Sequence, residues 1–109
     1  MNKLLITPET KEELVSLIKE RVRENPLKPY LLDICTSLIT DMSKLFYSYE
    51  NIKVLDLRTW DTSNVTDMSN MFAFCKSVKK LDLSSWDVSN VKSMENMFAF
   101  CYELENINL

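Results

Sequence analysis

The residues best suited by type to do chemistry are four aspartates in the second half of the chain, Asp61, Asp67, Asp82 and Asp87. Paired carboxylates serve general acid–base catalysis or bind calcium. Acid–base catalysis also needs a partner base, a nucleophile or a cofactor cradle, and this sequence has no histidine and no glycine. It has no Asp-x-Asp-x-Asp calcium loop either. We therefore expect a protein that is not an enzyme and has neither a metal site nor a cofactor.

Thiol chemistry is the second possibility, because the chain contains Cys35, Cys75 and Cys101. Their odd number and their spacing do not match a zinc site or a disulfide framework. A free cysteine behaves as a small buried hydrophobic residue. We expect three reduced thiols, and the alternative is a disulfide bridge between Cys75 and Cys101.

The elements that carry these residues follow from a sequence period of 26 residues. The segment that begins at Trp60 recurs at Trp86, and the Met-Phe-Ala-Phe-Cys run that ends at Cys75 recurs at Cys101. An earlier, degenerate copy has Ile34 at the tryptophan position. A fixed period in this range is typical of a stacked solenoid. The pattern predicts three 26-residue coils over residues 31–109, of which the first is degenerate.

Within each coil, the apolar pattern predicts a short helix and a strand. Met68, Met71, Phe72 and Cys75 fall at helical spacing, and residues 78–83 end in the alternation of a half-buried strand. The methionines and phenylalanines are expected to fill the core between coils. The tryptophans are expected to be structural, with each indole N–H bonded in the adjacent turn.

The aspartates fit structural positions in these elements. Asp61 and Asp87 open polar turns, where a short acceptor bonds to backbone N–H groups. Asp67 precedes a predicted helix, whose N-terminus favours negative charge. Asp56 and Asp82 lie between leucines, so the alternation predicts that both side chains face solvent.

Residues 1–30 are predicted to form a separate N-terminal unit, a short strand over residues 3–6 followed by an amphipathic helix over residues 10–24. Thr10 begins a capping-box sequence, and Pro26 cannot continue the helix. The helix is expected to cap the first coil. The predicted fold class is α/β: a leucine-rich-repeat-like solenoid, with stacked parallel strands on one face, short helices on the other, and an N-terminal helical cap.

Charge and hydropathy narrow the range of partners and locations. The net charge is −3, and residues 31–109 carry seven basic against eleven acidic residues, so direct binding of nucleic acid is not expected. No stretch approaches the roughly 20 apolar residues that span a bilayer, and no secretory signal is recognisable. These features predict a cytoplasmic protein without membrane contact.

The repeated run Trp-Asp-Thr-Ser-Asn-Val-Thr-Asp-Met-Ser-Asn-Met-Phe-x-x-Cys, followed by Leu-Asp-Leu-Ser-Ser, resembles the BspA-type leucine-rich repeat of bacterial, mycoplasmal and some phage-encoded proteins. The resemblance covers residues 31–109 and implies a solenoid used in adhesion or protein binding. Members usually have glycine before the helix-terminal cysteine, where this chain has Phe74, Phe100 and Ser48. We expect a more helical backbone at these positions.

We expect non-catalytic binding of a protein partner through the outward face of the strands. The residues predicted on that face are Val54, Asp56, Arg58, Lys80, Asp82, Ser84, Asn106 and Asn108. A second candidate is the edge formed by Leu104, Ile107 and Leu109, where an uncapped last coil predicts a homodimer or a partner contact. Two alternative functions stay open: a small phage-encoded inhibitor of a bacterial nuclease-based defence complex, and an adhesion fragment of a longer surface protein.

Overall fold

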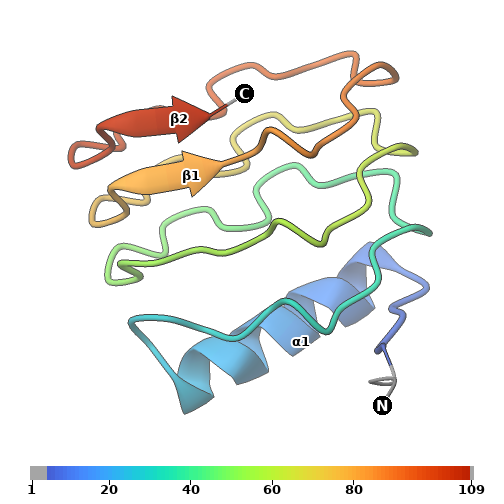
Figure 1. Ribbon diagram of the computed structural model, residues 1–109, viewed down its shortest axis with the longest axis horizontal. Helices are drawn as coiled ribbons and strands as arrows, with labels where there is room; N and C mark the ends of the chain where they lie inside the picture. The colour runs from blue at the N-terminus through green and yellow to red at the C-terminus, as the bar shows by residue number, and fades with distance from the viewer. Residues whose placement is uncertain (1–4, 109) are drawn as a thin grey trace.

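The computed structural model describes residues 5–108, and its regular elements are one helix and two short strands. Helix α1 spans Lys11–Glu24, strand β1 spans Lys80–Asp82 and strand β2 spans Asn106–Asn108. Figure 1 shows α1 at one end of the molecule, with the rest of the chain running back and forth in successive levels beyond it. The two strands pair in parallel at the far end, with Leu81 opposite Ile107.

The helix predicted over residues 10–24 is confirmed by α1. The Thr10 hydroxyl accepts the Glu13 N–H at 3.1 Å, and the Glu13 carboxylate accepts the Glu9 N–H at 2.8 Å. The first bond satisfies a donor that the helix start leaves open, and the second ties the residue before the N-cap to the first turn. On the inner side of α1, Leu14 and Ile18 are fully buried in the same core as the levels beyond the helix.

Of the strand predicted before this helix, residues 3 and 4 lie outside the described residues, and Ile6 forms a single parallel bridge with Ile34. The side chain of Arg21 joins the helix to the next segment through an ion pair with Asp33 at 2.7 Å. The predicted division of the chain at residue 30 stays a prediction.

The predicted fold class is wrong. The described residues contain a two-stranded sheet, β1 with β2, and no run of stacked strands with a short helix in each coil. Instead of a leucine-rich-repeat-like solenoid of regular elements, the levels consist mainly of turns and extended segments joined by hydrogen bonds between residues 25 to 29 apart.

The first strand expected, around residues 52–58, begins with the same contact as that at the start of β2, where Glu105 and Asn106 both donate to the Lys79 carbonyl, but its pairing does not continue. The N–H groups of Lys53 and Val54 both donate to the Leu27 carbonyl, at 2.8 and 3.1 Å. Pro29 follows two residues after Leu27 and has no N–H to donate, which stops a ladder there. Two residues of backbone pairing do not make a strand.

The helices expected at residues 68–75 and at the equivalent positions are missing for a different reason. Every second N–H leaves its own segment: Met68, Asn70, Phe72 and Phe74 donate to carbonyls 25 residues further on, at 2.8–2.9 Å. The N–H groups of Met71, Ala73 and Cys75 instead close four-residue turns, as Cys75 does onto the Phe72 carbonyl at 3.0 Å. An α-helix requires each N–H to bond four residues back, so this pattern excludes it.

Positive φ angles mark the turns that replace those helices. Six residues have φ between 55° and 63°, namely Lys44, Ser48, Asn70, Phe74, Asn96 and Phe100. The third position of a type II turn needs such an angle, which favours glycine or asparagine. Our expectation of a more helical backbone at Ser48, Phe74 and Phe100 was therefore wrong, since all three keep the left-handed conformation that suits glycine.

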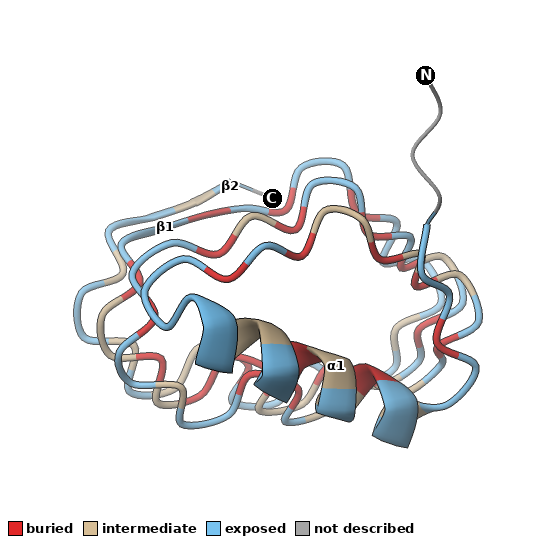
Figure 2. Cartoon of the chain, turned by 90° about the horizontal axis from the view of Figure 1, so that it is seen from below, coloured by how far each residue is buried: buried red, intermediate tan, exposed pale blue. Residues whose placement is uncertain are grey.

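The core lies inside the loops that the successive levels form and is filled largely by the residues predicted for it (Figure 2). Phe72 is fully buried and stacks on Phe46 and Phe98, with ring centroids 5.6 and 5.7 Å away and planes 4° apart. Met68 and Met71 are also fully buried, whereas Met94, one period after Met68, is 45 % exposed. Stacked aromatic rings one period apart hold neighbouring levels in register.

The left-handed turns generate a test of stability. Ser48 is exposed at φ 61°, and asparagine occupies the left-handed positions 70 and 96. Because asparagine tolerates this region better than serine, Ser48→Asn should raise the free energy of unfolding by about 0.5 kcal/mol and the melting temperature by about 3 °C. Ser16→Asn, at an exposed serine of α1 without positive φ, is the matched control and should leave both nearly unchanged, because serine and asparagine have similar helix propensities. A destabilised Ser48→Asn protein in thermal unfolding would contradict this reading of the turns.

Candidate functional site

The predicted binding face exists as an exposed side of the molecule, although β1 and β2 are its only regular strands in the part of the chain described. On it, Val54 is 44 % exposed, and Lys80 is exposed beside it in β1. The inward partners Leu55, Leu57 and Leu81 are buried, which confirms the predicted alternation around residues 55–57 and 81–83. The face is thus backed directly by the core.

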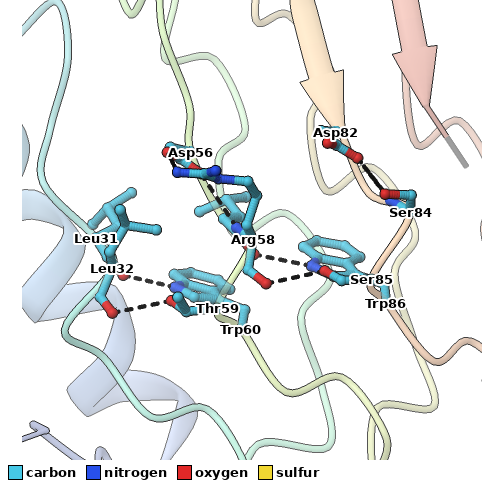
Figure 3. A network of polar contacts seen from close by, with 11 residues as sticks. Leu31, Leu32, Asp56, Arg58, Thr59, Trp60, Asp82, Ser84, Ser85 and Trp86 are labelled. Atoms are coloured by element: carbon cyan, nitrogen blue, oxygen red, sulfur yellow. Dashed lines mark hydrogen bonds and ion pairs between the residues drawn. The ribbon is translucent and has the colours of Figure 1, made fainter.

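The acidic residues of this face are already engaged with neighbours in the chain (Figure 3). Asp56 accepts from the Arg58 guanidinium through both oxygens, at 2.8 and 2.9 Å. Asp82 accepts the Ser84 hydroxyl at 2.6 Å and the Ser84 N–H at 3.1 Å. The hydrogen bond from Arg58 holds the pKa of Asp56 below its usual value, and that from Ser84 does the same for Asp82. These carboxylates are less available to a partner than the sequence suggested.

Behind these carboxylates the face is held by two buried tryptophans. The indole N–H of Trp60 donates to the Leu31 carbonyl at 2.9 Å, and that of Trp86 donates to the Leu57 carbonyl at 3.1 Å (Figure 3). Each indole N–H has an acceptor, as predicted. The acceptors lie 29 residues earlier in the chain, however, and not in the adjacent turn. Each indole therefore ties two levels together.

The remaining predicted residues lie on or next to β2. Asn106 and Asn108 are exposed opposite Lys80 and Asp82. In the predicted oligomer edge, Leu104 and Ile107 are half-buried and pack against the core. Leu109, the third residue of that edge, lies outside the described residues.

An open hollow of about 630 Å³ occupies the start of the face. Its lining includes the predicted residues Val54 and Lys80. The other lining residues were not predicted; the full lining is Lys53, Val54, Ser77, Lys79, Lys80 and Glu103. A hollow of this size, lined by one valine and by charged and polar side chains, is large enough for a few side chains of a partner.

The sequence period could have identified the missed residues. The lining consists of three pairs that are each 26 residues apart: Lys53 with Lys79, Val54 with Lys80, and Ser77 with Glu103. Strict alternation selected only the second pair, because it placed Lys79 inward. In the structure both Lys79 and Lys80 are exposed between the buried Val78 and Leu81.

The hollow is locally basic on an acidic protein. Lys53, Lys79 and Lys80 form no ion pair with any residue that the structure describes. Glu103 adds one carboxylate to the same lining. Unpaired ammonium groups around an exposed valine favour a ligand that combines carboxylates with apolar surface.

The aspartates singled out for chemistry serve backbone turns. Asp61, Asp67 and Asp87 each accept the N–H two residues on, at 2.8–2.9 Å, as predicted for Asp61 and Asp87. Asp67 does not precede a helix as predicted, because none forms there. Among residues 5–108 no group of three or more potential ligands is arranged to hold a metal ion.

The three cysteines are free thiols. Cys75 and Cys101 donate to the carbonyls of Phe46 and Phe72, at 3.1 and 3.0 Å, so each thiol bonds to the level before it. Burial raises the pKa of the Cys75 thiol to about 12. A thiol with so high a pKa is a poor nucleophile at neutral pH.

The turn aspartates give a pH prediction. Hydrogen bonds from Ser63 and Ser84 lower the pKa of Asp61 and Asp82 in the folded state. The stability that these carboxylates contribute is present above their unfolded pKa of about 3.9 and is lost as the pH falls through the lower folded value. Asparagine keeps the acceptor and removes the titration. Asp61→Asn with Asp82→Asn should therefore reduce the loss of the urea midpoint between about pH 5 and about pH 3.

The control for this measurement is Glu95→Gln, at an exposed carboxylate that accepts no hydrogen bond from the described residues. It should follow the wild-type urea curve at both pH values more closely than the double variant does. Equal acid sensitivity of the double variant and the wild type would refute a stabilising role of the two turns.

Within the described residues, no helix combines the length and the apolar character needed to cross a membrane. No curated protein and no solved structure matches the chain. A family model does match: the one described as Mycoplasma protein of unknown function, DUF285, over residues 23–109. The match begins within α1 and includes the whole candidate face. Since it covers far more than half of the sequence, the chain belongs to this mycoplasmal family, DUF285.

Proposed function

We propose that the protein is a non-catalytic binding module that recognises a protein partner through its lysine-lined hollow. The observation that carries this proposal is the set of three unpaired lysines, Lys53, Lys79 and Lys80, around the exposed side chain of Val54. Unpaired charges on a rigid face keep their full attraction for a complementary partner. The expected partner segment carries acidic residues next to an apolar one.

The fixed backbone behind the hollow supports specific recognition rather than non-specific electrostatic attraction. Lys80 lies in β1 next to the buried Leu81, and the backbone N–H of Val54 donates to the Leu27 carbonyl. A fixed backbone avoids the entropy cost of ordering a loop, so binding has to order only the lysine side chains. A few exposed lysines on a mobile loop would not offer this advantage.

The resemblance of residues 31–109 to the BspA-type repeat supports the same proposal, since that repeat implies adhesion or protein binding. The chemistry of the aspartates and thiols supports a non-catalytic role. Asp61 and Asp87 are used in turns, and the Cys75 thiol is buried and weakly acidic. We also propose that the protein functions in a reducing compartment, because the Cys75 and Cys101 thiols both donate hydrogen bonds to backbone carbonyls and must be reduced to do so.

The test begins with capture of partners from a cell lysate by the wild-type chain, followed by purification of the protein most enriched. Its affinity is then measured by calorimetry against Lys79→Glu with Lys80→Glu. The double charge reversal should weaken binding at least about tenfold, and raising the salt from about 50 to about 300 mM should weaken wild-type binding as well.

The matched control is Lys19→Glu with Lys92→Glu, which makes the same charge change at two exposed lysines outside the hollow. It should retain nearly the wild-type affinity. Equal losses in the two double variants would mean that only the overall charge matters, and unchanged affinity in both would place the partner on another surface. Either result would disprove binding in the hollow.

A further inference from the structure

A second hollow lies on the same face of the molecule, next to α1, and has a volume of about 270 Å³. Lys28 and Asp56 belong to its polar lining. Its apolar lining residues are Pro29, Tyr30, Leu31 and Leu32. Figure 3 shows Leu31 and Leu32 on the α1 side of the segment that carries Asp56. We call this the helix-side hollow.

One row of side chains joins the two hollows. Lys28 lines the helix-side hollow, Val54 and Lys80 line the lysine-lined hollow, and the three residues follow one another at intervals of 26 residues. The Val54 N–H donates to the Leu27 carbonyl at 3.1 Å, so the residue before Lys28 lies directly beside Val54. The two hollows are therefore neighbouring parts of one surface.

The helix-side hollow is preformed, because its backbone is tied to α1 and to the next level. The Arg21 guanidinium donates to the Tyr30 carbonyl at 2.7 Å, and the Leu31 carbonyl accepts the Trp60 indole N–H at 2.9 Å. The Tyr30 side chain is 46 % exposed, so a partner can reach its ring. A site on a fixed backbone binds without the cost of ordering a loop.

The size and the lining of the helix-side hollow fit one large apolar side chain of a protein partner. Its volume is below the range of about 300–1,000 Å³ that small-molecule pockets occupy. Accessible tyrosine rings beside aliphatic side chains are typical of the places where a protein partner is anchored. Lys28 forms no ion pair with any residue between positions 5 and 108, so its charge favours a carboxylate close to that apolar side chain.

The spacing of the levels shows that one segment can reach both hollows. Levels joined by backbone hydrogen bonds lie about 5 Å apart, so Lys28 and Lys80, two levels apart, are separated by about 10 Å along the row. An extended chain covers this distance in about three residues. A short linear segment is therefore long enough.

We propose that one extended segment of the partner occupies both hollows, with a large apolar side chain in the helix-side hollow and acidic residues a few positions away on Lys79 and Lys80. This inference rests on the proposed function and adds to it the place of the apolar contact. The lysines supply charge complementarity, and the ring of Tyr30 supplies the apolar anchor point.

The experiment measures the Kd of two synthetic peptides by NMR titration of the full chain. The first probe is Ser-Ser-Asp-Asp-Ser-Ser-Phe-Ser-Ser, and the second has serine in place of the phenylalanine. Burial of the phenylalanine should tighten binding at least about fivefold. The first peptide should shift the signals of Tyr30 and Leu32 together with those of Lys79 and Lys80, and the second should shift mainly the lysine signals.

A matched pair of tyrosine variants locates the apolar contact. Tyr30→Ser removes the exposed ring of the helix-side hollow, so the phenylalanine should then add less than about twofold to the affinity. Tyr47→Ser, at a tyrosine that is 43 % exposed and lines neither hollow, should keep the full gain. The all-polar peptide should bind both variants as it binds the wild type, which verifies that they are folded.

The outcomes separate this inference from the proposed function. A phenylalanine that adds no affinity, or as much in Tyr30→Ser as in the wild type, would overturn the inference; the proposed function would stand if both peptides lost affinity in Lys79→Glu with Lys80→Glu. Equal affinity of the all-polar peptide for that double variant and the wild type would refute the proposed function, and the inference with it. Shifts of the Tyr30 signals that grow with protein concentration, without peptide, would assign the helix-side hollow to a second copy and would also overturn the inference.

Discussion

The direction of alternate backbone N–H groups is the constraint on which this structure depends. In residues 68–74 every second N–H points to a carbonyl 25 residues on, and those between close turns within the segment. This division excludes a helix and requires left-handed residues such as Asn70 and Phe74. It also brings equivalent side chains face to face, so Phe72 lies between Phe46 and Phe98. The composition of the core, the left-handed turns and the aromatic stacking all follow from this alternation of hydrogen bonds between and within levels.

The element that depends on neighbouring residues alone was predicted well, and the elements that depend on pairing with another segment were not. Thr10 and Pro26 define α1 because a helix start and a helix stop depend on neighbouring residues. The methionine–phenylalanine pattern identified most of the core but the wrong backbone, because the spacing i, i+3, i+4, i+7 fits a run of tight turns as well as a helix. A helix and a run of tight turns differ only in the acceptor of each N–H group, and here that acceptor lies in another segment. The strand expected near Leu55 failed similarly, since Pro29 opposite cannot donate.

The candidate site was predicted in part for a related reason. Val54 and Lys80 follow from alternation with the buried leucines, and both line the hollow. Lys53 and Lys79 break that alternation, so the pattern of a regular strand left them out, although their 26-residue spacing marks them as a pair. The carboxylate of Asp56 looked available in the sequence, because a bidentate bond to Arg58 depends on a side-chain geometry that spacing does not specify.

The proposed contact at the hollow depends on donors that the fold leaves at its surface. The hollow presents ammonium groups, which attract oxygen acceptors. The chain as a whole carries a net charge of −3, but Asp61 and Asp82 already accept hydrogen bonds within their own turns, and Asp56 is paired with Arg58. The carboxylates in these turns thus already accept hydrogen bonds within the protein, while the ammonium groups of the hollow remain unpaired at its surface. The proposal of a partner with carboxylate oxygens rests on this local excess of donors and not on the net charge of −3, which alone would have suggested a basic partner.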